Sequence, residues 1–208
     1  MNDKDGTEEK LNLITLGNSA VGKTSYILKF TSNSFQQVYL TTVGIDFKSK
    51  IIIMPNKKKY NIVFYDTTGE ERFRSISVNT VKNANGIVLM YDITKKKTFD
   101  DISVWMKSIK EIKDDNFPII LIGNKSDLEE QRQVKKEDGE EIAKKYNIDF
   151  YETSNKDGIN IEESCMDLIN KVIIYKENLK KLNEIRKEGL SLSDKRINKD
   201  KKSSGCCK

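Results

Sequence analysis

One stretch decides the fold, and it reads Gly17-Asn18-Ser19-Ala20-Val21-Gly22-Lys23-Thr24. An apolar run, residues 11–16, precedes it, and residues 25–30 alternate like the start of an amphipathic helix. A strand, the spacing G-x-x-x-x-G-K-[ST] and then a helix form the context that a phosphate-binding P-loop requires. The glycines leave room for backbone N–H groups around a phosphate chain, and the helix N-terminus adds its positive dipole end. The stretch therefore predicts a loop in which Lys23 contacts phosphate and Thr24 ligates Mg²⁺.

The composition is that of one charged globular domain with an extension. The 208 residues are 37% hydrophobic and 33% charged, and no apolar run approaches the ~18 residues of a membrane span. Residues 1–10 are charged and lack the apolar core of a signal peptide, so we expect no secretory leader. Three cysteines cannot form a disulfide framework, and histidine is absent. We therefore expect a reducing cytosol and no histidine-based catalysis or metal site.

The positive charge lies in the C-terminal part of the chain. From residue 176 onward, eleven Lys or Arg face five Asp or Glu, whereas the net charge of the whole chain is +5. The preceding residues are therefore close to neutral and show no basic face of the kind that binds nucleic acid. We expect no nucleic-acid partner.

Hydrophobic patterns predict alternating strands and helices after the P-loop. Two strands, Ile45–Met54 and Tyr60–Tyr65, should form an antiparallel hairpin because only a short turn joins them. The later elements are expected as a strand at Gly86–Asp92, a helix at Thr98–Lys110, a strand at Pro118–Gly123, a helix at Lys135–Tyr146, a strand at Asp149–Glu152 and a helix from Ile159 to about Lys187. This order predicts an α/β fold: a six-stranded, mostly parallel sheet with one antiparallel strand and helices on both faces.

In a sheet of this kind, ligands lie outside the carboxyl ends of the strands. Four predicted strands end there, near Gly17, Asp66, Asn124 and Thr153. We therefore expect these four segments to converge on one crevice.

The segment Asn124-Lys125-Ser126-Asp127 indicates which base is bound. A carboxylate at the base edge accepts from both N1–H and N2–H₂ of guanine, whereas adenine offers no such pair of donors. Asp127 should therefore select GTP over ATP. Lys125 can lie across the base, and Asn124 can tie this loop to the P-loop.

These residues together carry a resemblance: the chain is identified as a member of the Rab family of small GTPases, in the Ras superfamily. Rab character depends on three motifs, Thr42-Val43-Gly44-Ile45-Asp46-Phe47, Glu71-Arg72-Phe73-Arg74-Ser75-Ile76 and Tyr91-Asp92-Ile93-Thr94. The resemblance covers about residues 10–175 and the C-terminal end. It implies a P-loop GTPase fold, GTP or GDP as bound nucleotide, Mg²⁺ as cofactor and hydrolysis of GTP to GDP and phosphate.

The resemblance also assigns roles by position. Thr42 resembles the switch I threonine that senses the γ-phosphate, Gly69 matches the switch II contact to that phosphate, and Phe35 falls where an aromatic ring packs on guanine. The implied nucleotide-binding residues are Ser19, Ala20, Val21, Gly22, Lys23, Thr24, Ser25, Phe35, Thr42, Gly69, Asn124, Lys125, Asp127, Ser154, Asn155 and Lys156. The implied catalytic residues are Lys23, Thr42, Gly69 and Glu70. The implied Mg²⁺ ligands are Thr24, Thr42 and, through water, Asp66.

The chain departs from the family at Glu70, where the family has the glutamine that orients the attacking water. A carboxylate can still accept a hydrogen bond from water, but its charge repels the phosphate oxygens. We therefore expect slow intrinsic hydrolysis, with a functional cycle open through an activator that supplies arginine and glutamine. Asn155 also departs, since it replaces alanine, but that position acts largely through its backbone N–H, so we expect little effect.

The tail beyond about Glu188 combines low hydrophobicity with clustered charge, which predicts disorder. Cys206 and Cys207 resemble the double-geranylgeranylation site of Rab proteins, and two lipid chains with basic residues give stable anchoring. The resemblance thus implies a monomer on the cytoplasmic face of intracellular membranes that exchanges with the cytosol. Its implied partners are an exchange factor, a GTPase-activating protein, a GDP-dissociation inhibitor and effectors. Cys165 is expected to be an inert core residue.

The predicted organisation is a flexible extension at residues 1–10, a GTP-binding domain at 11–175 and a basic tail at 176–208. Two other functions stay open. One is a constitutively GTP-bound interaction module that has lost hydrolysis through Glu70. The other is a P-loop kinase of small molecules, which would need arginines near the site and would give Asp127 no role.

Overall fold

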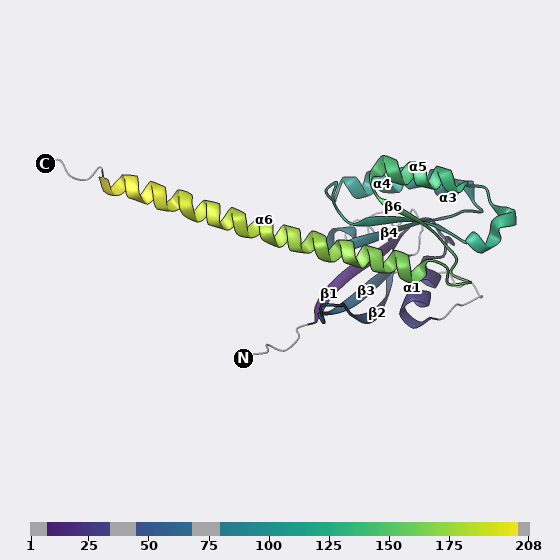
Figure 1. Cartoon of the computed structure of the whole chain (residues 1–208). Helices are drawn as coiled ribbons and strands as arrows, with labels where there is room; N and C mark the ends of the chain where they lie inside the picture. Colours follow the sequence, from purple (N-terminus) through teal and green to yellow (C-terminus); the bar gives the residue numbers. More distant parts are fainter. Residues whose placement is uncertain (1–7, 34–44, 68–79, 204–208) are drawn as a thin grey trace. The chain divides into compact units, whose positions relative to one another are not determined.

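The computed structural model describes residues 8–33, 45–67 and 80–203, and Figure 1 shows the course of the chain. The strands are β1 (Glu9–Leu16), β2 (Ile45–Ile53), β3 (Lys59–Thr67), β4 (Gly86–Asp92), β5 (Ile119–Asn124) and β6 (Asp149–Thr153). The helices are α1 (Lys23–Ser32), α3 (Lys96–Asp100), α4 (Ile102–Lys110), the 3₁₀ helix η2 (Ser126–Gln131), α5 (Lys136–Tyr146) and α6 (Ile161–Ser203).

The strands form one sheet in the order β2-β3-β1-β4-β5-β6. The hairpin β2–β3 is antiparallel, with Phe47 opposite Tyr65, and the other four neighbouring pairs are parallel. Every residue of β4 and β5 is buried, as expected for central strands that are covered on both faces. The predicted six-stranded, mostly parallel α/β sheet is confirmed.

Helices cover both faces of the sheet (Figure 1). On one face, α1 buries Tyr26, Ile27 and Phe30, and the Phe30 ring meets Phe64 of β3 edge to face at a centroid distance of 5.7 Å. On the opposite face α4 buries its apolar stripe, which consists of Ile102, Met106 and Ile109. This packing holds the carboxyl ends of β1, β3, β4 and β5 in fixed register, and the loops that follow those strands build the site.

The helix predicted at Thr98–Lys110 is in fact two elements, α3 and α4, which meet at Asp101. The backbone of Asp101 keeps helical angles (φ −74°, ψ −11°), so the junction is a local break in a helical path. The hydrophobic stripe could not reveal this break, because Phe99 and Ile102 are buried on either side of it.

The last helix, α6, corrects the prediction of a helix that ends near Lys187. It has 43 residues and ends at Ser203. Residues 188–203 include leucine, lysine and arginine and no proline, so local propensity supports a helix there without an apolar stripe. By its contacts the chain divides into two compact units, Met1–Val172 and Ile173–Lys208. No helix in the described part of the chain is long and apolar enough to cross a membrane.

Candidate functional site

The P-loop joins β1 to α1 in a conformation that only its glycines allow. Gly17 has φ +132°, and a Cβ atom there would lie 2.1 Å from the Met90 carbonyl oxygen of β4. Gly22 has φ +103° and is the N-cap of α1; a Cβ there would strike the amides of Asn124 and Asn155. The loop is thus pressed against the neighbouring strand and against the loops that follow β5 and β6, which explains the glycine spacing physically.

Lys23 is buried at the base of the P-loop and is only 4% exposed. Its Nζ donates hydrogen bonds to the carbonyl oxygens of Gly17 (3.0 Å) and Asn18 (2.8 Å). Burial lowers the pKa of this amine to about 8, and the nearby Asp66 carboxylate opposes that shift. A buried cation is costly unless it is paired. At the start of a helix, where anions bind readily, a phosphate oxygen is a suitable partner for it.

Thr24 and Asp66 meet beside Lys23, as the sequence predicts for the metal side of the site. The Thr24 hydroxyl donates to Asp66 Oδ2 at 2.5 Å, and Asp66, near the end of β3, is 3% exposed. Hydroxyl and carboxylate oxygens are the donors that Mg²⁺ prefers, and Mg²⁺ usually takes few of them from the protein. The residues present therefore fit this cation, with Thr24 and Asp66 as the described groups that would hold it.

Asn124 connects three segments at the carboxyl edge of the sheet. Its Nδ2 donates to the Val21 carbonyl in the P-loop at 2.7 Å, and its Oδ1 accepts from the Thr153 hydroxyl of β6 at 3.1 Å. The predicted tie between this loop and the P-loop is therefore present. Asp127, three residues further on, accepts from the Ser154 hydroxyl at 2.8 Å, so the loops after β5 and β6 hold each other beside the P-loop.

Two side-chain contacts at this edge of the sheet could not be predicted from the sequence. The Lys125 ammonium lies 2.6 Å from the carboxylate of Asp92, which is fully buried at the end of β4. The side chain of Asn155 donates to the Gly22 carbonyl at 2.9 Å, whereas this position was expected to act largely through its backbone N–H. Hydrophobic patterns mark where strands end, but they do not indicate which polar side chains bond across those ends.

The site residues divide according to what the structure describes. It brings the P-loop, Asp66, the Asn124–Asp127 loop and the Ser154–Lys156 loop together, as the topology predicts, although Lys156 itself is exposed. The remaining predicted residues lie outside the described residues: Phe35, Thr42, Gly69, Glu70, Cys206 and Cys207. Cys165 is fully buried, which confirms it as a core residue, and burial raises the pKa of its thiol well above the usual value.

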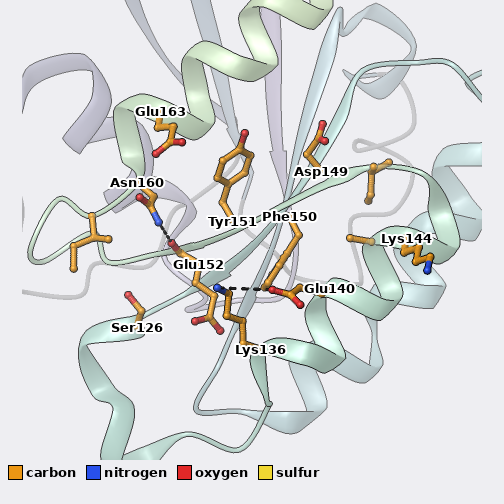
Figure 2. Close-up of a pocket in the computed structure, with 13 residues that line it drawn as sticks. Ser126, Lys136, Glu140, Lys144, Asp149, Phe150, Tyr151, Glu152, Asn160 and Glu163 are labelled. Atoms are coloured by element: carbon orange, nitrogen blue, oxygen red, sulfur yellow. Dashed lines mark hydrogen bonds and ion pairs between the residues drawn. The ribbon is translucent and has the colours of Figure 1, made fainter.

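A hollow of about 730 Å³ lies next to the site, between α5, β6 and the start of α6. Figure 2 shows lysine, glutamate and aspartate side chains around it, with Lys136 directed at Glu140 (3.7 Å) and Asn160 donating to the Glu152 carbonyl at 2.8 Å. These two contacts pair some of the lining groups with one another, and we assign the hollow no function.

The fold and the position of the P-loop after β1 define the class of protein, which is a P-loop nucleotide-binding protein.

Comparisons with known proteins give the family. The Ras family model matches residues 12–174. The chain is 36% identical over 195 residues to Ras-related protein Rab-13 of Rattus norvegicus, with 94% of each chain covered. It is 37% identical over 171 residues to Ras-related protein Rab-3C of Bos taurus (80% and 75% covered) and 41% identical over 172 residues to Ras-related protein Rab-8 of Diplobatis ommata (83% and 80%). The chain therefore belongs to the Rab group of the Ras family and is a small GTPase, which confirms the resemblance and excludes the kinase.

The Asn155 contact generates a prediction. Asn155→Ala removes the hydrogen bond to the Gly22 carbonyl and should speed GDP dissociation about fivefold, since one such bond contributes ~1 kcal/mol. The measurement is the loss of a fluorescent GDP analogue in the presence of excess GDP. The control is Asn170→Ala, because Asn170 is exposed on α6. An unchanged rate would show that this amide does not support the P-loop.

Proposed function

We propose that this small GTPase is a membrane-anchored switch in vesicle traffic, which binds GTP and GDP with Mg²⁺ and hydrolyses GTP slowly. One observation carries the proposal: the P-loop, the Thr24–Asp66 pair and the Asn124–Asp127 loop meet at one edge of the sheet through direct hydrogen bonds. The similarity to proteins named Rab supports the role in traffic.

In this proposal the P-loop binds the phosphates. The backbone N–H groups of residues 19–25 surround the phosphate chain, and Lys23 contacts the β- and γ-phosphates. Bound Mg²⁺, held by Thr24 and by Asp66 through water, would neutralise developing phosphate charge. The enclosed position of Lys23 supports the assignment, because its Nζ is already directed toward the loop carbonyls at 2.8 and 3.0 Å.

The loops after β5 and β6 would bind guanine. Asp127 would accept from N1–H and N2–H₂ of the base, Lys125 would lie across the ring, and Ser154, Asn155 and Lys156 would close the pocket. The hydrogen bond from Ser154 to Asp127 supports this role, since it holds one carboxylate oxygen and so orients the other. Phe35 would pack on the base from the first switch.

Two further residues, Thr42 and Gly69, would make the protein a switch. Each would contact the γ-phosphate or its Mg²⁺, so both loops would stay closed only while GTP is bound. Hydrolysis would release them, and partners that recognise the closed loops would dissociate. The expected partners are therefore effectors, together with an exchange factor, a GTPase-activating protein and a GDP-dissociation inhibitor.

Glu70 favours one alternative within this proposal. In place of the glutamine that orients water, it would bring a negative charge toward the phosphates. If that repulsion dominates, the chain is a hydrolysis-deficient, GTP-bound module that recruits effectors.

The C-terminal part would supply the membrane anchor. Geranylgeranyl groups on Cys206 and Cys207, with the basic residues before them, would hold the protein on the cytoplasmic face of an intracellular membrane while allowing exchange with the cytosol. The excess of lysine and arginine after residue 176 supports this assignment, because cytoplasmic leaflets are anionic.

The guanine contact can be tested with Asp127→Asn. The new amide places an N–H donor opposite a position where guanine also has a donor but xanthine has an oxygen acceptor. The preference for GDP should therefore fall on the order of 100-fold, and the affinity for xanthosine diphosphate should rise. Competition of both nucleotides against a fluorescent analogue measures this. Asp115→Asn, a change at an exposed aspartate, should leave the preference as it is. Unaltered selectivity in Asp127→Asn would refute the contact.

The effect of Glu70 can be tested by single-turnover hydrolysis of bound GTP. If the carboxylate repels the transition state, Glu70→Gln should hydrolyse GTP about tenfold faster, which corresponds to ~1.4 kcal/mol of barrier. Glu163→Gln, on the exposed side of α6, is the matched control. A wild-type rate equal to or faster than that of the variant would mean that the carboxylate serves in place of glutamine. That result would remove the hydrolysis-deficient alternative.

The membrane anchor can be tested with Cys206→Ser/Cys207→Ser in eukaryotic cells. Loss of both thiols removes the attachment points of two lipid chains, so the protein should move from the membrane fraction to the soluble fraction. Fractionation followed by immunodetection measures the shift, and Ser203→Ala/Ser204→Ala controls for changes next to the cysteines. Recovery of the cysteine variant in membranes would count against prenylation.

A further inference from the structure

The side chain of Asn18, the first residue after Gly17, forms hydrogen bonds with the junction of α3 and α4 and with α4 itself. Its Nδ2 donates to Asp101 Oδ2 at 2.6 Å, and its Oδ1 accepts from the indole Nε1–H of Trp105 in α4 at 3.1 Å. The other oxygen of Asp101 accepts from the Lys97 ammonium, also at 2.6 Å. We call these four side chains, Lys97, Asp101, Asn18 and Trp105, the Asn18 clamp.

The burial of Asp101 strengthens its hydrogen bond to Asn18, whereas the Lys97 side chain is largely exposed. Asp101 is 8% exposed, and short bonds to a buried carboxylate are the charge-assisted kind. Burial by itself would raise the pKa of Asp101, but the hydrogen bonds from Lys97 and Asn18 hold that pKa below its usual value. The carboxylate is therefore ionised at neutral pH and acts only as an acceptor.

The clamp is connected to the buried cation of the site through the main chain of Asn18. While its side chain bonds to Asp101 and Trp105, its carbonyl oxygen accepts from Lys23 Nζ at 2.8 Å. On the other side, α4 is fixed to the sheet by its buried stripe, Ile102, Met106 and Ile109. The position of the peptide that Lys23 contacts is thus set by a helix that is itself packed in the core.

We propose that Asn18 is a positioning residue for nucleotide retention, which locks the start of the P-loop to α4 and so slows the release of bound nucleotide. This inference rests on the proposed role of the P-loop in binding nucleotide phosphates. Asn18 does not need to contact the nucleotide, because it acts through the loop backbone and Lys23.

The direction of the hydrogen bonds makes the clamp specific. An indole N–H can only donate and an ionised carboxylate can only accept, so residue 18 must accept on one side and donate on the other. Asparagine does both. Aspartate has the same shape but would set two carboxylates at the distance of a hydrogen bond.

Exchanging residues 18 and 101 should therefore restore the clamp. With Asn18→Asp and Asp101→Asn together, the new amide at 101 would donate to the new carboxylate at 18. The carboxylate would still accept from Trp105, and the amide oxygen at 101 would still accept from Lys97. All the hydrogen bonds of the clamp would be kept. Only the bond between residues 18 and 101 would have its donor and acceptor exchanged.

The experiment measures dissociation of a fluorescent GDP analogue from the full chain with Mg²⁺ present. Relative to wild type, Asn18→Asp should release the analogue roughly tenfold faster or more at neutral pH, and the exchanged double variant should return to within about threefold. Asn170→Asp, the same change at an exposed position, should match wild type. Trp105, the single tryptophan, gives a second readout, because its emission should change in Asn18→Asp and return in the double variant.

The pH dependence separates the clamp from a general loss of stability. The charged groups that face this pair among the described residues are Lys97 on α3 and Lys23 at the end of the P-loop. In Asn18→Asp the two carboxylates should share a proton as the pH is lowered, because each raises the pKa of the other. That proton supplies the missing donor, so release should slow toward the wild-type rate. The exchanged double variant should show no such recovery, since its amide donates at every pH.

The inference would be overturned by release from Asn18→Asp at the wild-type rate, or by a double variant that is no slower than Asn18→Asp. A double variant that regains the wild-type melting temperature but not the slow release would also overturn it, because the clamp would then be structural only. A wild-type chain that retains no GDP would instead refute the proposed nucleotide function, and the inference with it.

Discussion

The side-chain amide of Asn124 joins three segments of the site that lie far apart in the sequence. It donates to Val21 in the P-loop and accepts from Thr153 at the end of β6, so it spans the carboxyl edge from β1 to the outermost strand. Its position depends on β5, which is buried along its whole length. Because Asn124 is 1% exposed, leaving its donor or the facing carbonyl unpaired would cost about 1–3 kcal/mol. The positions of the Asn124–Asp127 loop and of the P-loop therefore depend on each other.

Much of this arrangement could be predicted from the sequence, because the signals are periodic or local. The continuous apolar runs in β4 and β5 identify central parallel strands, and parallel strands place their carboxyl ends at one edge. The spacing from Gly17 to Thr24 has few structural solutions, since a Cβ at Gly17 would meet the backbone of β4. The convergence of the P-loop, Asp66 and Asn124 follows from these constraints together.

The rest depends on side chains that meet only after the sheet has formed, and no periodicity encodes them. Asn155 and Gly22 are 133 positions apart, and Asn18 and Trp105 are 87 apart. Asn155 in particular was expected to act through its backbone, because the sequence gives no sign that its amide reaches Gly22. The length of α6 could not be predicted for a different reason. After residue 187 the chain has no apolar stripe, so only weak local propensity favours a helix there, and composition alone indicates disorder.

The P-loop is held from outside by three asparagine side chains, and the choice of amides has an electrostatic consequence. Asn124 and Asn155 fix loop carbonyls, and Asn18 ties the start of the loop to α4. Lysine at position 124 or 155 would add positive charge beside Lys23 and destabilise its buried ammonium further, whereas aspartate at either position would repel the phosphates. Neutral amides supply the directional bonds without either effect. The amides therefore fix the shape of the loop without adding charge, and the buried ammonium of Lys23 keeps its charge for binding the phosphates of the ligand.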